Sequence, residues 1–97
     1  LVVTADVRKR SMDVRVADTV TVPSDKSLHL WAIPRSGGPR SLGVLLDNRH
    51  ATLALSDKAI GSDVVMLAIS LEPKGGSPDP NGPTGPVIYK GSWVKLL

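Results

Sequence analysis

The sequence contains no cysteine and no phenylalanine, and only one tyrosine and two tryptophans occur in its 97 residues. The lack of cysteine excludes a disulfide framework and any thiolate metal site. The shortage of aromatic side chains argues against a nucleic-acid-binding domain, because such domains stack bases on aromatic rings. We therefore expect no nucleic-acid partner.

The chain also lacks a concentrated basic region, although its net charge is +3 and its pI is about 9.6. Lysine and arginine are spread along the sequence, and the one cluster is Arg8, Lys9 and Arg10. Apolar residues alternate with polar ones on both sides of this cluster. We interpret it as the solvated turn of a hairpin rather than a phosphate-binding patch.

Long apolar runs are absent as well. The longest uninterrupted one covers residues 64–69, whereas a membrane-spanning helix needs roughly 20 apolar residues. The chain is therefore not expected to cross a bilayer. It begins at Leu1 without an initiator methionine or a signal-peptide pattern. We expect residues 1–97 to form a single domain cut from a longer protein.

The residues that are present follow the pattern of β-strands. Apolar and polar residues alternate in stretches 3–7, 12–16 and 51–55, which is the period of a strand with one buried face. Residues 28–33 and 64–71 are apolar at nearly every position, as in central strands covered on both faces.

Two further strands are expected at residues 41–46 and 87–96, the latter with a bulge or bend at Gly91. Residues 56–61 have room for little more than one helical turn. Short strands joined by turns predict an all-β fold, an antiparallel β-sandwich or a small open barrel of about six to seven strands.

Residues 73–86 differ abruptly in composition, since five of these fourteen residues are proline and four are glycine. We predict an ordered excursion packed on the sandwich, because proline lowers the entropy lost on ordering and apolar strands anchor both ends. If the loop contacts a partner, its polar side chains are the candidates. These are Lys74, Asp79, Asn81 and Thr84.

Glu72, the only glutamate, immediately precedes this loop. Its carboxylate is expected to accept hydrogen bonds from amides of the glycine-rich turn that follows, or to pair with an arginine. Trp31 is expected in the core, because the apolar residues Leu30 and Ala32 flank it.

Candidate catalytic and metal-binding residues are few. His29 and His50 are the only histidines, and their spacing fits no zinc site, so we interpret them as a strand residue and a turn residue. No nucleophile elbow occurs. The sequence Gly75-Gly76-Ser77 lacks the Gly-Lys-Ser/Thr ending of a phosphate-binding loop. We predict no enzyme activity, no metal and no cofactor.

Two motifs together resemble a known family. A Leu-Trp-x-x-Pro motif at residues 30–34, followed by Ser-x-Gly at residues 41–43, is similar to a pattern of the anti-sigma-K factor C-terminal domain. Residues 70–78 and 83–87 resemble that family's most distinctive signature. The residues that carry the resemblance are Trp31, Pro34, Gly43, Glu72, Pro73, Gly75, Gly76, Ser77 and Pro78.

The resemblance implies a regulatory domain on the extracytoplasmic (periplasmic) side of the bacterial cell membrane. Such proteins carry a cytoplasmic sigma-binding domain and one transmembrane helix, neither of which is in this chain. Regulated proteolysis by membrane proteases then frees the sigma factor for transcription. The sigma factor is thus an expected partner only through the absent cytoplasmic domain.

A second function stays open from the sequence. A β-sandwich could bind an envelope peptide or glycan through the 73–86 loop without any part in sigma regulation. A sigma-factor gene beside the parent gene would favour the first function. An enzyme would need an acid–base or metal cluster that the sequence does not offer.

Overall fold

A computed structural model describes residues 2–6, 8–16, 21–45, 50–54 and 63–92 of the 97-residue chain. These residues form seven strands and no helix, so they contain no helix long and apolar enough to span a membrane. The strands are β1 (Val2–Asp6), β2 (Ser11–Arg15), β3 (Lys26–Pro34), β4 (Arg40–Val44), β5 (His50–Ala54), β6 (Val64–Pro73) and β7 (Val87–Ser92).

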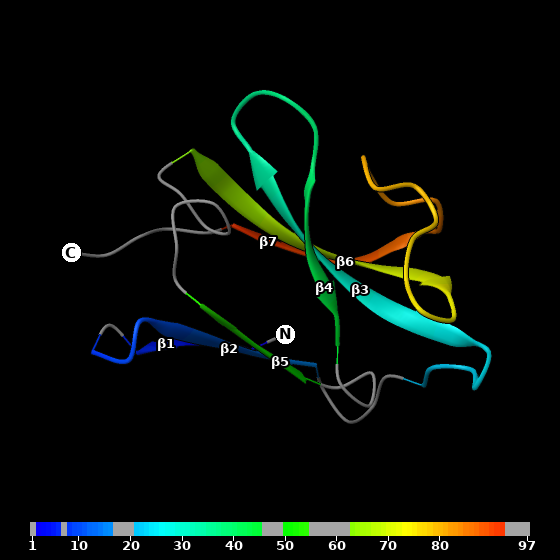
Figure 1. The fold of residues 1–97 in the computed structure, drawn as a ribbon, viewed down its shortest axis with the longest axis horizontal. Helices are drawn as coiled ribbons and strands as arrows, with labels where there is room; N and C mark the ends of the chain where they lie inside the picture. The colour runs from blue at the N-terminus through cyan, green and yellow to red at the C-terminus, as the bar shows by residue number, and fades with distance from the viewer. Residues whose placement is uncertain (1, 7, 17–20, 46–49, 55–62, 93–97) are drawn as a thin grey trace.

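The strands are arranged in two antiparallel sheets. One sheet has the order β1-β2-β5, and the other has the order β4-β3-β6-β7. Figure 1 shows the three-stranded sheet lying below the four-stranded one. The predicted all-β antiparallel fold is confirmed, and the described strands form two open sheets rather than a closed barrel.

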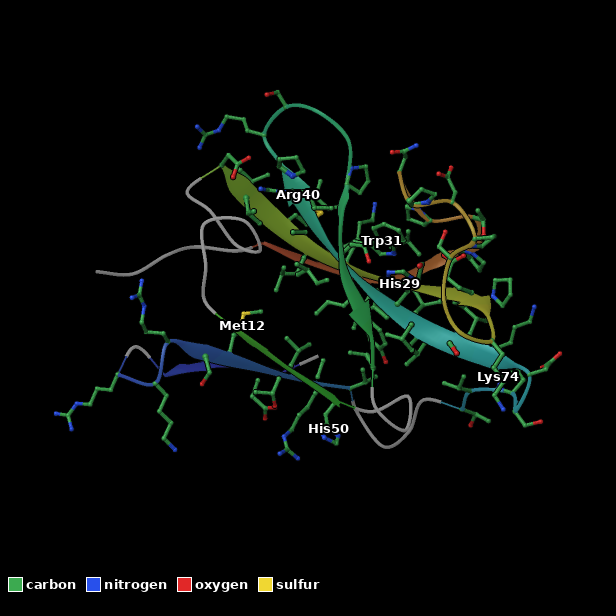
Figure 2. All side chains as sticks on the ribbon, viewed as in Figure 1. Met12, His29, Trp31, Arg40, His50 and Lys74 are labelled. Atoms are coloured by element: carbon green, nitrogen blue, oxygen red, sulfur yellow. The ribbon has the colours of Figure 1, made fainter. Side chains whose placement is uncertain are left out.

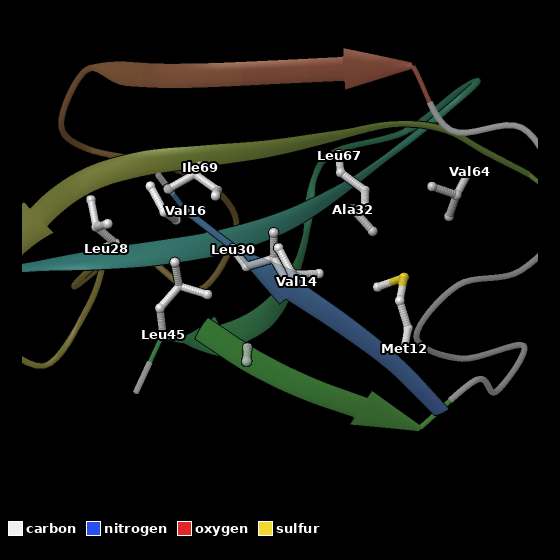
Figure 3. Close-up of a cluster of buried hydrophobic side chains, with 11 residues drawn as sticks. Met12, Val14, Val16, Leu28, Leu30, Ala32, Leu45, Val64, Leu67 and Ile69 are labelled. Atoms are coloured by element: carbon white, nitrogen blue, oxygen red, sulfur yellow. The ribbon is translucent and has the colours of Figure 1, made fainter. Parts of the chain in front are cut away.

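The hydrophobic core lies between the two sheets (Figure 3). In β2 the buried residues Met12 and Val14 alternate with the more exposed Asp13 and Arg15, as the period of two requires. The opposite sheet contributes apolar side chains from its two central strands. These are Leu28, Leu30 and Ala32 of β3 and Val64, Leu67 and Ile69 of β6.

Strand β3 is buried on both of its faces, which confirms the prediction of a central strand at residues 28–33. Leu28 and Leu30 point into the core between the sheets. Side chains alternate along a strand, so Ser27, His29 and Trp31 lie on the opposite side of the four-stranded sheet. We call this side, away from the three-stranded sheet, the outer face.

The predicted burial of Trp31 in the core is confirmed. Its side chain is 0% exposed, as predicted, but it is not part of the hydrophobic cluster between the sheets. Because side chains alternate along β3, Trp31 lies on the outer face together with Ser27 and His29. The apolar neighbours of Trp31 in sequence predicted its burial but did not specify which face of the sheet it lies on.

Of the further predictions for turns and strand ends, one is confirmed and two are wrong. Residues 8–10 form the exposed turn between β1 and β2, as predicted. Gly91 is not a bulge, since it pairs regularly with Leu67 and the irregularity lies nearer Ile69 and Ser70. His50 is the first residue of strand β5 rather than a turn residue. The predicted helical turn at 56–61 and the strand continuation at 93–96 lie outside the described residues.

Candidate functional site

The loop between β6 and β7, residues 74–86, lies against the outer face of the four-stranded sheet. We call it the β6–β7 loop. Figure 1 shows it in yellow and orange, beside one end of β3 and β6. Hydrogen bonds from β3 hold its first residues, and a carboxylate from β6 holds its last ones. The expected packing of this segment on the sandwich is confirmed.

The start of the loop is attached to β3 and to the turn before it. The amide of Gly75 donates to Ser27 Oγ at 2.9 Å, and the amide of Ser77 donates to His29 Nδ1 at 3.0 Å. The amide of Lys74 donates to the carbonyl of Asp25 at 3.1 Å. Backbone groups of the loop thus bind side chains that alternate along one face of β3.

Gly76 permits this close approach. Its φ is +110°, and an added Cβ would lie 2.9 Å from both His29 Nδ1 and Val44 Cγ2. Backbone strain and lack of space both exclude a side chain there. Gly76 of the family motif is therefore explained by the distance between the loop and the imidazole ring, whereas Gly75 is favoured by its φ of +96°.

The end of the loop is attached to Glu72, whose side chain is 0% exposed. The amides of Thr84 and Gly85 each donate to Glu72 Oε1 at 3.1 Å. The hydroxyl of Thr84 donates to the same oxygen at 2.6 Å. The carboxylate does accept backbone amides, as expected, but they come from the far end of the loop and not from the turn that follows Glu72.

Gly85 is required at this second attachment. An added Cβ would lie only 1.8 Å from the carbonyl oxygen of Leu71, because the returning loop lies directly against β6. Leu71 also donates its amide to the carbonyl of Pro86 at 2.9 Å, so the two segments are hydrogen-bonded here.

The charge on Glu72 is retained despite its burial. Burial alone would raise the pKa of the carboxyl group. Hydrogen bonds from Ser70, Thr84 and Gly85 outweigh that effect and lower the pKa below its usual 4.5. Each hydrogen bond to an ionised group typically stabilises by about 1.5–3 kcal/mol, so these donors offset the cost of removing the carboxylate from water.

A chain of hydrogen bonds connects Glu72 to the centre of the sheet. The indole Nε1–H of Trp31 donates to Ser70 Oγ at 2.9 Å, and the Ser70 hydroxyl is in turn hydrogen-bonded to Glu72. Ser70 is 0% exposed. All polar atoms in this chain of contacts have partners, which a buried polar network needs.

His29 lies beside this network, with its ring stacked on Trp31 at 4.1 Å between centroids and 15° between planes. Figure 2 shows both residues on the four-stranded sheet, away from His50 on the other sheet. Because Nδ1 accepts the amide of Ser77, we infer that the neutral ring carries its proton on Nε2. That proton is donated to Ser41 Oγ at 2.6 Å. Burial lowers the pKa of His29 below 6.5, although the charge of Glu72 opposes the shift.

The middle of the loop is closed by its own side chains. Ser77 Oγ donates to the carbonyl of Gly82 at 2.7 Å, and Asp79 Oδ1 accepts the amide of Asn81 at 2.8 Å. Lys74, Asp79 and Asn81 are exposed. Thr84, the fourth residue proposed for partner contact, is exposed as well, although its amide and hydroxyl are hydrogen-bonded to Glu72.

The remaining motif residues lie in strands or in the β6–β7 loop. Pro34 is the last residue of β3 and is buried. Gly43 has a φ of +108°. It pairs with Leu30, whereas the next pair in the ladder between β3 and β4 is Trp31 with Ser41, so the register shifts at this point. A glycine at this point lets the edge strand bend. Pro73 ends β6, and Pro78 is exposed in the loop.

The sequence interpretation did not identify Ser27, Ser41 and Ser70 as part of this site. One signal was available: every second residue of β3, from Ser27 through His29 to Trp31, carries a polar atom. Within the described residues, no group of three or more His, Cys, Asp or Glu side chains could hold a metal ion. The arrangement holds the β6–β7 loop through hydrogen bonds, and two of the acceptors, His29 and Glu72, can change protonation state.

The chain matches the model of a known protein family. The family model described as "Anti-sigma-K factor rskA, C-terminal" matches residues 1–87. No curated protein and no solved structure matches the chain significantly. The match covers both motifs, from the tryptophan strand to the end of the β6–β7 loop. The chain therefore belongs to the family of anti-sigma-K factor C-terminal domains.

Proposed function

We propose that this domain is the extracytoplasmic regulatory part of a membrane-anchored anti-sigma factor, and that it controls sigma-factor release by regulated proteolysis. The observation that carries the proposal is the family match over residues 1–87. In this proposal the sigma factor binds another domain of the parent protein, in the cytoplasm. The present domain acts on the other side of the membrane, where membrane proteases cut the parent.

The architecture supports a role in gating proteolysis. Proteases cut extended segments, and cleavage of a folded domain follows the population of its opened form. The four-stranded sheet is covered by the core on one face and by the β6–β7 loop on part of the other. A domain of this kind shields adjacent chain while it is folded, and exposes it when it opens. The lack of cysteine also suits an oxidising compartment, because no thiol can pair incorrectly.

The test is removal of the domain from the full-length parent protein. We expect deletion of residues 1–97 to change the activity of a reporter for the cognate sigma factor, while a pull-down still recovers sigma factor with the parent protein. The matched control is a parent protein in which an unrelated β-sandwich of similar size replaces the domain, so that only the identity of the domain changes. A β-lactamase fused after residue 97 should confer resistance, because that enzyme protects a cell only outside the cytoplasm.

Unchanged reporter activity at normal levels of the parent protein would contradict the regulatory role. Loss of sigma binding on deletion would contradict the assignment of that contact to another domain. Binding of an envelope peptide or glycan, with sigma regulation unaffected, would instead favour the alternative of a simple binding module.

A further inference from the structure

We propose that the β6–β7 loop is a pH-sensitive latch, in which neutral His29 holds the start of the loop on the outer face and protonated His29 releases it. Ionised Glu72 holds the end of the loop and releases it only in stronger acid. This inference concerns the domain itself and does not rest on its role in sigma regulation.

The bond between His29 and Ser77 requires the neutral ring. A backbone amide can only donate, and Nδ1 can accept it only while that nitrogen carries no proton. Protonation of the ring would place two N–H groups against each other over 3.0 Å. The other ring nitrogen cannot take the added proton, because it already donates to Ser41 Oγ.

The position of the ring also disfavours its protonation while the loop is docked. His29 is 6% exposed, with its ring between Trp31 and the backbone of Gly76. An imidazolium ion there loses most of its hydration. Release of the loop exposes the ring to water and frees the Ser77 amide. It therefore removes both the loss of hydration and the repulsion between the two N–H groups.

The groups around His29 determine the direction of its response. The charged group that acts on it is Glu72, from β6, which favours protonation. Its neighbours from β4 and from the loop, Ser41 and Ser77, do not titrate in this range. Burial is the larger effect, so the pKa of the docked ring lies below 6.5, the value expected once the ring is released into water.

The sign of the coupling follows from this difference. Between the two pKa values the released form binds more protons than the docked form, so docking weakens as the pH falls below 6.5. Within this window the released population rises by up to about tenfold for each pH unit. The bonds of Glu72 to Thr84 and Gly85 persist until the pH falls below 4.5, because the pKa of this carboxyl is itself lowered. The hold on the start of the loop thus begins to weaken at a higher pH than the hold on its end.

An NMR titration of the 97-residue chain between pH 7.5 and pH 4 tests the latch. At pH 7.5 the ring nitrogen shifts of His29 should show the tautomer with its proton on Nε2. Hydrogen exchange of the Ser77 amide, corrected for the intrinsic effect of pH, should accelerate with the midpoint of His29. The amides of Thr84 and Gly85 should stay protected through that transition.

Two variants complete the test. His29→Asn puts a non-titrating amide oxygen near the place of Nδ1, so the corrected exchange of Ser77 should become independent of pH above 4.5. His50→Asn, at the other histidine, should leave the transition unchanged. A Ser77 amide that stays protected beside a protonated His29 would overturn the proposal, as would a transition that survives His29→Asn or disappears in His50→Asn. If His29→Asn fails to fold, the titration of the unmodified chain decides alone.

Discussion

The indole nitrogen of Trp31 donates a hydrogen bond of 2.9 Å to the hydroxyl of Ser70, which lies 39 residues later in the chain. Both side chains lie on the outer face, and Trp31 pairs with Ala68 across the ladder between β3 and β6. Ser70 also contacts Glu72. The bond therefore connects the centre of the sheet to the group that holds the end of the β6–β7 loop.

Removal of the Ser70 hydroxyl tests this connection. Ser70→Ala leaves the buried indole N–H without its acceptor, which should lower the free energy of unfolding by about 1–3 kcal/mol. In a Trp31→Phe background the same change should be less costly, because the donor is already absent. Urea unfolding of the two single variants and the double variant measures the coupling. A coupling energy near zero would show that the bond adds nothing to stability.

Truncation of Trp31 tests its burial directly. Trp31→Ala removes a side chain that is 0% exposed, and such changes typically cost about 3–5 kcal/mol of unfolding free energy. Val87→Ala, at a residue that is 40% exposed, should cost less than about 0.5 kcal/mol. A loss below about 1 kcal/mol for the tryptophan variant would place the side chain at the surface.

Replacement of Glu72 tests the role of its charge. Glu72→Gln directs an amide NH₂ group towards the donors of Thr84 and Gly85, so we expect a loss of about 1–3 kcal/mol in unfolding free energy. The unmodified carboxyl has a lowered pKa, so its contribution is present above pH 4.5 and is lost as the pH falls below that value. The variant should lack this part of the acid dependence. Asp79→Asn, at an exposed carboxylate of the same loop, is the control and should behave like the unmodified chain.

Two glycines of the loop provide a matched pair. Gly85→Ala would place a Cβ 1.8 Å from the Leu71 carbonyl oxygen, which forces the loop away from β6. We expect a loss of about 2 kcal/mol or more, at the upper part of the range for overpacking. Gly82→Ala meets only Pro39 Cγ at 3.9 Å, an ordinary contact, and should be close to neutral. Thermal unfolding of both variants is the measurement, and equal losses would contradict the close approach of Gly85 to Leu71 in β6.

The sequence alone determined the class of fold and the position of its main strands. Alternation at Met12 and Val14 specified a strand with one buried face, and the apolar stretches at 28–33 and 64–71 specified two central strands. These features depend on the period of the side chains along one segment, so no distant contact is needed to infer them. The family was also recognisable, because its motifs are short and local.

Only the tertiary structure decided which groups meet on the outer face. Alternation shows that Trp31 and Leu30 point to opposite sides of a strand, but it cannot say which side another sheet covers and which side a loop covers. Likewise, the sequence around Glu72 does not indicate that Thr84 and Gly85 return to this carboxylate after a loop rich in proline and glycine. A buried carboxylate or imidazole takes whichever donors the folded chain brings within about 3 Å, and that choice depends on the path of the whole chain.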